Sequence, residues 1–311
     1  MINTSPEVSV VIPVYNGAAL LERALDSVYA QHYTDYEVIV VDDGSIDNTH
    51  EIAARYLSRQ GMRGRCIRQP NKKVAAARNV GMQASAGAYI ALLDHDDLWY
   101  PDKLQVVMRA FERHPEADLI CHNEHILRGG RIVRTSHNGP ASGGRLYEQL
   151  LFSGNVLCVS SVVFKKIKAL AIGGFREDAQ FDTVEDYDFW MRLSRVAQFR
   201  FLEDVLAAYY VVDGSASRRI EYLHANLEHL LQDHFSTYFG ERAGLLAHWR
   251  MRRRLSVVYR SAATQLMRYH EQPDKQREYV MRMLRTYPFT ARNLVRAALW
   301  AANLPSAVRG E

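Results

Sequence analysis

The chain has few cysteines, and their arrangement argues against a fold held together by disulfides or by a cysteine-bound metal. Cys66, Cys121 and Cys158 are odd in number, far apart and without paired spacing. A disulfide framework or a zinc site needs even-numbered or closely spaced cysteines, so we predict neither. Such sparse cysteine is typical of a reducing compartment, and we expect a cytoplasmic location.

Long apolar stretches are also missing. No run of about 18 apolar residues occurs, and the first ten residues lack the basic and apolar regions of a signal peptide. We therefore predict no membrane-spanning helix. With 311 residues and 48% hydrophobic content, the chain can form one large domain or a domain with an appendage.

Charge is unevenly distributed along the chain. Residues 241–311 contain 14 Lys and Arg against 5 Asp and Glu, a net charge of +9, whereas the whole chain carries +4. After Ser217 the signals are almost all helical, which predicts an α/β domain over residues 1–217 and a basic helical region over residues 218–311. The basic helices favour either a packed bundle or contact with an anionic membrane surface. No nucleic-acid-reading motif occurs, so we expect no nucleic-acid partner.

The first 115 residues alternate strand and helix signals, which is typical of a parallel sheet. Runs rich in β-branched residues at 8–15, 36–41 and 88–94 predict buried strands. An alanine-rich helix is expected over residues 74–84. Farther along the chain the pattern becomes mixed, with a strand-like run at residues 156–164. We predict an α/β fold with a mixed, mainly parallel central sheet.

Polar and acidic residues directly follow three of these predicted strands, at 13–16, 42–45 and 94–97. Ligands of open α/β sheets bind beyond the carboxyl ends of the strands, so these segments are expected to line one site. A single acidic residue at such a place usually forms a turn or caps a helix. Three carboxylates among four consecutive residues repel one another. A divalent cation held by one or two carboxylates and substrate phosphates would relieve that repulsion.

Four motifs occur in a fixed order: VSVVIPVYN, VDDGSIDNT, AAARNVGMQASAGAYIALLDHDD, and GGF followed by VEDYDFWMRL. Together they resemble the signature series of family 2 glycosyltransferases with the GT-A fold, over about residues 8–217. The resemblance implies a catalytic domain over residues 1–217 that uses a nucleotide-sugar donor and Mn²⁺ or Mg²⁺. It also implies transfer of the sugar, with inversion, to a hydroxyl group of a glycan or lipid-linked acceptor.

The resemblance assigns the donor-binding residues. Tyr15 corresponds to the residue that stacks on the nucleotide base, and its neighbours Pro13 and Asn16 are expected to line the same site. Asp43 corresponds to the carboxylate that accepts a hydrogen bond from a ring N–H of the base. A carboxylate at this point favours uracil over cytosine, which has no proton at that ring position, so we expect a UDP-sugar. Tyr15 as a buried tyrosine and Asp43 as a turn residue are the structural alternatives.

The resemblance also assigns the metal and the chemistry. Asp94 and Asp96 form the Asp-x-Asp pair, the first near the ribose and the second on the metal that bridges the diphosphate. Asp186 corresponds to the general base that deprotonates the acceptor hydroxyl. Its structural alternative is an acidic residue at a helix N-terminus, favoured by the helix dipole. Arg78 and Lys73 could reach the diphosphate, but a solvated helix face explains them equally well.

Two departures from the family pattern bear on the donor site. Lys73 stands where related chains often have a glycine in a turn. A Tyr-Arg-x-His stretch is also lost, since Tyr210 and Val212 occupy the arginine and histidine positions. Asp213 is a candidate replacement for the missing histidine.

Two other functions are compatible with the same sheet. A nucleotidyltransferase normally begins with a glycine-rich loop that bears Arg and Lys, which residues 10–16 lack. A non-catalytic nucleotide-sugar-binding protein would be favoured by loss of Asp96 or Asp186, and both are present. The sugar, the acceptor and the oligomeric state stay open at this point.

Overall fold

The computed structural model describes residues 5–59, 63–140, 145–211, 220–240, 244–268 and 272–303. Two compact units are present, Met1–Tyr147 with Asn155–Ser215, and Glu148–Gly154 with Ala216–Glu311. The boundary expected between residues 217 and 218 lies outside the described residues.

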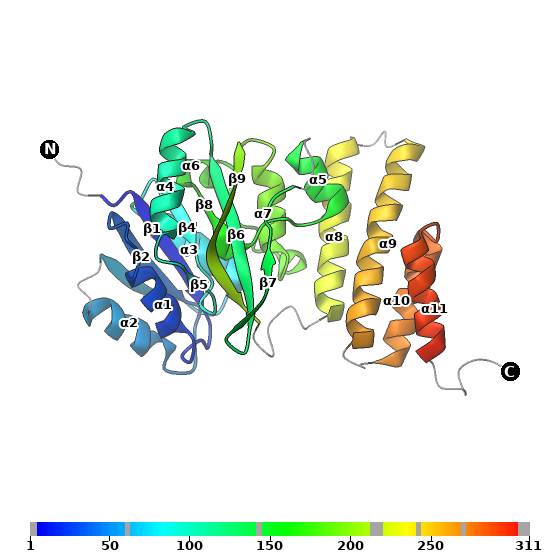
Figure 1. The fold of residues 1–311 in the computed structure, drawn as a ribbon, viewed down its shortest axis with the longest axis horizontal. Helices are drawn as coiled ribbons and strands as arrows, with labels where there is room; N and C mark the ends of the chain where they lie inside the picture. Colours follow the sequence, from blue (N-terminus) through cyan, green and yellow to red (C-terminus); the bar gives the residue numbers. More distant parts are fainter. Residues whose placement is uncertain are drawn as a thin grey trace. The chain divides into compact units, whose positions relative to one another are not determined.

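The first unit is built on one sheet, shown with its helices in Figure 1. Its strands are β1 (Val8–Val14), β2 (Tyr36–Asp42), β3 (Gly64–Arg68), β4 (Tyr89–Leu92), β5 (Leu98–Trp99), β6 (Leu119–Arg128), β7 (Arg131–Ser136), β8 (Val162–Lys165) and β9 (Phe199–Tyr210). Its helices are α1 (Leu21–Tyr29), α2 (Thr49–Arg59), α3 (Lys73–Ala84), α4 (Lys103–Arg113), α6 (Lys166–Ala171) and α7 (Glu185–Leu193).

The strand order is β3-β2-β1-β4-β8-β6-β9-β5, and β7 pairs with β6. The half of the sheet formed by β3, β2, β1 and β4 is entirely parallel. Beyond it, β8 runs antiparallel to both β4 and β6, while β9 runs parallel to β6. The predicted α/β fold with a mixed central sheet is confirmed.

Side chains of β1 point alternately to the two faces of the sheet, and helices cover both faces. Its seven residues are all buried, as expected for a central parallel strand. Val10 and Ile12 join the core that includes residues of α1, α2 and α4. On the opposite face Val11 meets α3, where a Cβ added to Gly81 would lie 2.3 Å from a methyl group of Val11. Glycine at position 81 therefore lets α3 approach the sheet closely.

The strand expected over residues 156–164 is only partly present. Residues Val159–Ser161 form a 3₁₀ turn, and β8 begins after it at Val162. The turn is fixed by hydrogen bonds between Ser160 and residues distant in the sequence, so local periodicity could not predict it.

The second unit is a bundle of α8 (Ile220–Phe239), α9 (Leu245–Arg268), α10 (Pro273–Thr286) and α11 (Ala291–Asn303). Helix α9 packs against the other three, and the core between them includes Tyr259, Ala262 and Val280. Pro273 opens α10 at its first turn, where a missing N–H costs nothing. Among the described residues, no helix is long and apolar enough to cross a membrane.

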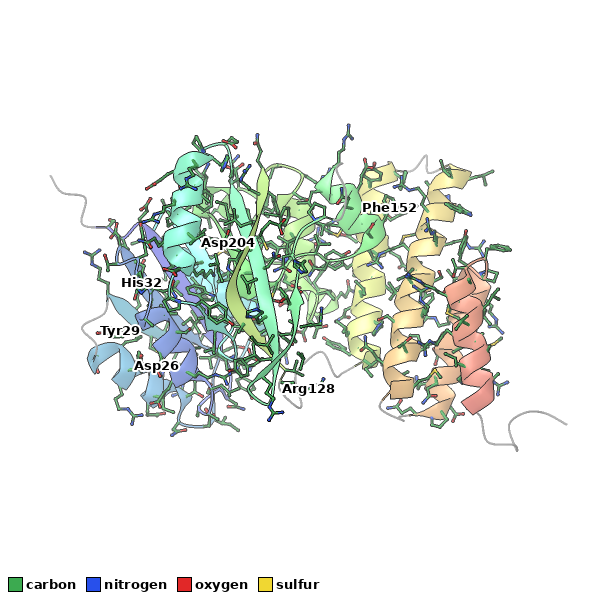
Figure 2. The ribbon with its side chains drawn as sticks, viewed as in Figure 1. Asp26, Tyr29, His32, Arg128, Phe152 and Asp204 are labelled. Carbon is green, nitrogen blue, oxygen red and sulfur yellow. The ribbon has the colours of Figure 1, made fainter. Side chains whose placement is uncertain are left out.

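Residues Glu148–Gly154, which include most of helix α5 (Leu146–Ser153), belong to this second unit. From the sequence we expected them in the α/β domain of residues 1–217. Phe152, labelled in Figure 2, packs edge-on against Tyr238 and Phe239, and the Arg250 guanidinium lies 3.7 Å from its ring centroid. These aromatic contacts hold α5 on the bundle.

Candidate active site

The predicted donor residues meet at the carboxyl edge of the parallel strands. In the sheet register Val14 is paired with Asp42, and Val11 is paired with Leu92. The chain segments that follow β1, β2 and β4 therefore leave the sheet side by side. The structure thus brings the predicted residues on these three segments to one edge, which is where an open α/β sheet binds its ligand.

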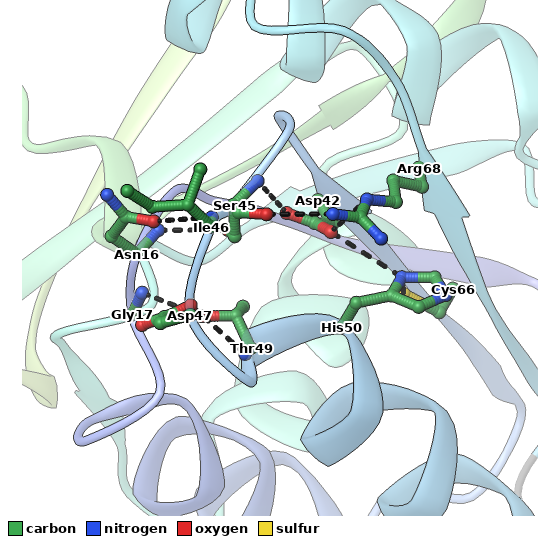
Figure 3. A network of polar contacts seen from close by, with 10 residues as sticks. All are labelled: Asn16, Gly17, Asp42, Ser45, Ile46, Asp47, Thr49, His50, Cys66 and Arg68. Carbon is green, nitrogen blue, oxygen red and sulfur yellow. Dashed lines mark hydrogen bonds and ion pairs between the residues drawn. The ribbon is translucent and has the colours of Figure 1, made fainter.

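The segment after β1 is held by the loop after β2, as Figure 3 shows. Asn16 has a φ of 50° and its amide donates to Ser45 Oγ at 2.9 Å, while its side-chain oxygen accepts from the Ile46 amide at 3.0 Å. The Gly17 amide donates to Thr49 Oγ1 at 3.0 Å. Asn16 therefore positions the loop, whereas Tyr15 is 47% exposed and is not the buried tyrosine of the structural alternative.

Asp42 and Asp43 are adjacent but have different surroundings. The Asp42 side chain is fully buried; it accepts from the Ser45 amide at 2.9 Å and pairs with Arg68 at 3.3 Å and with His50 at 3.5 Å (Figure 3). His50 also contacts the thiol of Cys66, which is one of three free cysteines. These contacts make Asp42 the structural anchor of the loop.

Asp43 binds the loop that precedes α3. One carboxylate oxygen, Oδ1, accepts from Gln69 Nε2 at 2.6 Å and from the Lys72 amide at 2.8 Å. The other, Oδ2, accepts from the Lys73 amide at 2.8 Å. Since a carboxylate has about four acceptor positions, these bonds leave one on Oδ2. Asp43 therefore positions the loop before α3, a structural role different from the turn after β2 that was the sequence-based alternative, and one acceptor position remains on Oδ2.

Lys73 adopts a left-handed conformation with a φ of 75°. A non-glycine residue in this region costs about 1 kcal/mol or more, which explains why a glycine suits this position. The hydrogen bond from the Lys73 amide to Asp43 holds the strained residue in place. The turn is thus retained without its glycine, and the lysine side chain is exposed.

The three carboxylates after β4 are held differently. Arg78 Nη2 donates to Asp94 at 2.8 Å, and the buried Asp97 accepts from Ser160 Oγ at 2.6 Å. Among the described residues, none donates a side-chain or distant backbone hydrogen bond to the Asp96 carboxylate. Burial and the charge of Asp94 raise the pKa of Asp96. Asp96 is therefore the member of the trio that receives no such bond on either oxygen from the described residues.

Arg78 links the predicted base to the predicted donor edge, the edge of the sheet formed by the segments after β1, β2 and β4. Its side chain is only 3% exposed, and Nη1 donates to Glu185 at 2.7 Å while Nη2 holds Asp94. Burial alone would lower the pKa of Arg78, but the charges of Asp94 and Glu185 raise it above its usual range. The sequence analysis gave Arg78 no role because its position on an alanine-rich helix was equally typical of a solvated face. The structure shows a buried bridge between two carboxylates.

Asp186 lies in the first turn of α7, next to this bridge. Oδ1 accepts from the Tyr187 amide at 2.7 Å, and Oδ2 accepts from Asn155 at 3.4 Å. Burial raises the pKa of Asp186, and the positive charge of Arg78 partly offsets that rise. For Glu185, burial outweighs the charge of Arg78 and raises the pKa to about 7. Glu185 and Asp186 thus form an acidic pair, and Arg78 lies between Glu185 and Asp94.

Ser160 is a site residue that the sequence did not indicate. Its hydroxyl donates to Asp97 and accepts from the Asp94 amide at 3.1 Å. Its carbonyl accepts from Trp99 Nε1 at 2.8 Å and from the buried Lys103 Nζ at 2.9 Å. One serine thereby fixes both ends of the loop that carries Asp96.

Arg23 supplies a cation near the position of the missing family arginine. Its Nη2 donates to the backbone oxygen of Asp96 at 2.8 Å, and its guanidinium lies 3.7 Å from the ring centroid of Tyr210. The Tyr210 amide donates to Asp97 at 3.2 Å. Val212 and Asp213, the positions of the missing histidine and of its candidate replacement, lie outside the described residues.

The described residues contain no group of three His, Cys, Asp or Glu side chains arranged to hold a metal ion. Any divalent cation would need ligands from a bound molecule besides Asp96. A nucleoside diphosphate supplies such oxygens, and Mg²⁺ in proteins often combines one or two carboxylates with substrate phosphates. Within the described residues, the Asp96 carboxylate fits that kind of site better than an all-protein cage.

The site thus combines an edge of parallel strands with an exposed tyrosine, an acidic loop held by hydrogen bonds, and the Asp96 carboxylate. Residues 9–166 match the profile described as "Glycosyl transferase family 2". The chain therefore belongs to glycosyltransferase family 2, as the motif resemblance predicted.

Among the relatives, an uncharacterized glycosyltransferase of Rickettsia typhi is 32% identical over 222 residues, which cover 68% of this chain and 66% of the relative. In another relative the match spans only 26% of that protein's length. The chain is thus similar to parts of its curated relatives.

Two solved structures share the fold. S. aureus TarS 1–349 in complex with UDP-GlcNAc has a TM-score of 0.62 at 15% identity, covering 96% of this chain and 93% of that chain. The mannosyltransferase PcManGT from Pyrobaculum calidifontis, in complex with GDP-Man and Mn²⁺, has a TM-score of 0.60 at 18% identity, with 99% and 83% coverage. At these identities the likeness confirms the GT-A fold.

Proposed function

We propose that this chain is an inverting glycosyltransferase that moves a sugar from a UDP-sugar to a hydroxyl group of a glycan or lipid-linked acceptor. Family membership and fold neighbours that hold a UDP-sugar and a GDP-sugar support a nucleotide-sugar donor. The observation that carries the proposal is the buried bridge of Arg78, which ties Asp94 on the donor edge to Glu185 beside Asp186. A donor site and a base are thereby parts of one charge network.

The chemistry proposed for these residues is a direct displacement. Asp186 takes the proton of the acceptor hydroxyl as the acceptor oxygen forms a bond to the anomeric carbon. The bond from that carbon to the diphosphate oxygen breaks, and UDP leaves with its electron pair. Because the acceptor attacks opposite the leaving group in one step, the anomeric configuration inverts.

Tyr15, Pro13 and Asn16 are proposed to line the base site, with Asp94 near the ribose. A tyrosine offers a flat apolar face to a pyrimidine ring and loses little conformational entropy in doing so. Asp96 would hold Mn²⁺ or Mg²⁺ together with the two phosphates. Bound there, the cation would neutralise charge on the departing diphosphate.

We expect UDP to bind more tightly than CDP and GDP in calorimetric titrations. The remaining acceptor position on Asp43 suits the ring N–H of uracil; cytosine lacks that proton, and a purine presents its N–H farther from the ribose. Asp43→Ala should weaken UDP binding by about tenfold or more, the usual effect of losing a hydrogen bond to a charged group.

The control for this substitution is Gln69→Leu. It removes one loop contact of Asp43 at 2.6 Å but leaves the carboxylate, so the preference for UDP should remain. Equal affinity of the wild type for all three diphosphates would overturn the assignment of the nucleotide.

We further expect UDP affinity to depend on a divalent cation through Asp96. Even changes to outer-shell partners of a metal cost about 10- to 100-fold, so Asp96→Ala should weaken UDP binding in Mn²⁺ by at least about tenfold. In EDTA the wild type and the variant should bind equally weakly. Asp204→Ala, which removes an exposed carboxylate labelled in Figure 2, is the matched control. The same UDP affinity with Mn²⁺ and with EDTA would refute the bridging cation.

We also propose that the basic helical region contacts an anionic membrane surface, which suits a lipid-linked acceptor and a location at the cytoplasmic face of a membrane. Residues 241–311 carry a net charge of +9, and each Lys or Arg near an anionic leaflet contributes about 1 kcal/mol. Flotation with anionic and neutral vesicles at two salt concentrations tests this contact. Equal flotation with both kinds of vesicle at low salt would exclude it.

A further inference from the structure

The helical unit contains a pocket that the proposed reaction does not use. It lies where α9 and α11 pack together, the yellow-orange and red helices of Figure 1, and has a volume of about 310 Å³. Its lining residues are Arg260, Thr264, Ala291, Arg292, Val295 and Arg296. Three of these six residues are arginines, and none of the six is acidic.

The three arginines do not pair with acidic residues in the described part of the chain. Arg260 Nη1 donates to the side chain of Asn293 at 2.7 Å, and Arg296 Nη1 lies 3.7 Å from the sulfur of Met267. The Nε of Arg296 is buried without a hydrogen-bond partner. In the same unit Arg282 does pair with a carboxylate, that of Glu228, at 2.7 Å. The pocket arginines differ from Arg282 in that no acidic partner is present for them among the described residues.

These like charges repel one another. Burial, and then the charges of Arg292 and Arg296, lower the pKa of Arg260. Holding three guanidinium groups around one cavity without a counterion is unfavourable, and an anion in the cavity would reverse the sign of these interactions. Because arginine stays protonated under all physiological conditions, deprotonation does not relieve the repulsion, and a bound anion would relieve it more strongly than the solvent that screens the exposed Arg292.

The geometry favours a phosphate over a simple carboxylate. Guanidinium groups bind phosphate oxygens through paired N–H donors, and three of them match a group with several anionic oxygens. Ala291 and Arg292 also lie in the first turn of the 13-residue helix α11, whose backbone N–H groups and dipole attract anions.

Apolar residues adjoin the arginines on α11. Val295 lines the pocket and is 58% exposed, and Leu294 and Leu299 are 57% and 47% exposed. From this arrangement we propose that the pocket of Arg260, Arg292 and Arg296 binds a phosphate group, carried by a lipid headgroup or by a soluble phosphate. This site is separate from the donor edge and does not depend on the glycosyltransferase reaction.

The experiment compares binding of two probes to the full chain in EDTA, without nucleotide. One probe is inorganic phosphate, measured by calorimetry, and the other is vesicles of zwitterionic lipid that contain phosphatidic acid, measured by flotation. Arg292→Gln and Arg296→Gln each remove one donor from the pocket, and Arg277→Gln removes the same charge from an exposed position on α10. We avoid Arg260 because it supports the buried Asn293, so its loss could disturb folding.

Each pocket variant should weaken binding of the probe by about tenfold or more, while Arg277→Gln should stay near the wild type. Binding of vesicles but not of free phosphate identifies a lipid headgroup as the source, and the reverse identifies a soluble phosphate. If neither probe binds, or if Arg277→Gln weakens binding as much as the pocket variants do, the proposal is wrong. A melting temperature for each folded variant excludes a loss caused by unfolding.

Discussion

Asp186→Asn should lower kcat by about 10²- to 10⁴-fold while leaving UDP affinity close to that of the wild type. An alcohol is a poor nucleophile at neutral pH, and proton removal by a positioned base contributes about this much to the rate. The asparagine keeps the shape of the side chain and can still accept the Tyr187 amide through its oxygen. What it loses is the basic oxygen that faces Asn155 at 3.4 Å. Initial rates with a radiolabelled UDP-sugar, together with UDP titrations, measure both effects.

Asp188→Asn is the matched control on the same helix. The Asp188 carboxylate is buried and pairs with Arg192 at 2.7 Å and with Arg176 at 3.5 Å. Its substitution should therefore lower the melting temperature and change kcat little. If folded Asp186→Asn protein turned over at a near-normal rate and only melted earlier, Asp186 would be a helix-terminus residue and its role as the base would be excluded.

The pH dependence provides a further readout of the same residue. Burial raises the pKa of Asp186 above that of an ordinary aspartate, about 3.9. A general base works only when deprotonated, so kcat should rise with pH through this raised value and level off above it. The rise should be lost in the residual activity of Asp186→Asn.

Arg78→Met should be the most destabilising single substitution among those proposed for this chain. Removing one partner of a buried ion pair costs about 3 to 5 kcal/mol in the free energy of unfolding, because the remaining charge is left uncompensated. Here two carboxylates lose their partner together, Asp94 at 2.8 Å and Glu185 at 2.7 Å. Urea denaturation measures the loss of stability, and Arg78→Lys should recover only part of it since an ammonium cannot bridge both carboxylates in the same way.

The sign of the pH effect separates this mechanism from a packing defect. Arg78 lowers the pKa of Glu185 and of Asp186, so its removal raises both values further. Below these raised values the carboxyls take up protons and the uncompensated charge disappears. The destabilisation by Arg78→Met should therefore be larger at pH 8 than at pH 5, whereas a loss of packing alone would be nearly independent of pH.

Arg192→Met gives the matched control for activity. Arg192 is also largely buried, and it binds Asp188 at 2.7 Å and the backbone oxygens of Ile172 and Gly174. Both substitutions should destabilise the protein, but only Arg78→Met should move the rise of kcat to higher pH. An unchanged pH profile in Arg78→Met would show that Arg78 does not act on the base.

The strand ends could be predicted because their signals are local. Runs of β-branched residues mark β1, β2 and β4, and the polar residues that follow each run are adjacent in the sequence. Parallel strands that alternate with helices place those ends together, so the position of Asp43 beside the segment after β1 followed from the pattern. The turn at Ser160 did not follow, because its partners Asp94 and Asp97 lie more than 60 residues away.

The sequence by itself determined the family, the α/β fold and the edge of the sheet where a nucleotide would bind, since periodicity and motif order are properties of neighbouring residues. Only the tertiary structure decided how the charges are paired. Arg78 meets Glu185 across 107 positions, and Arg260 faces Arg296 from a different helix. Which elements pack together decides whether a charged side chain is solvated, buried in an ion pair or placed beside like charges. No local stretch of the chain contains that information.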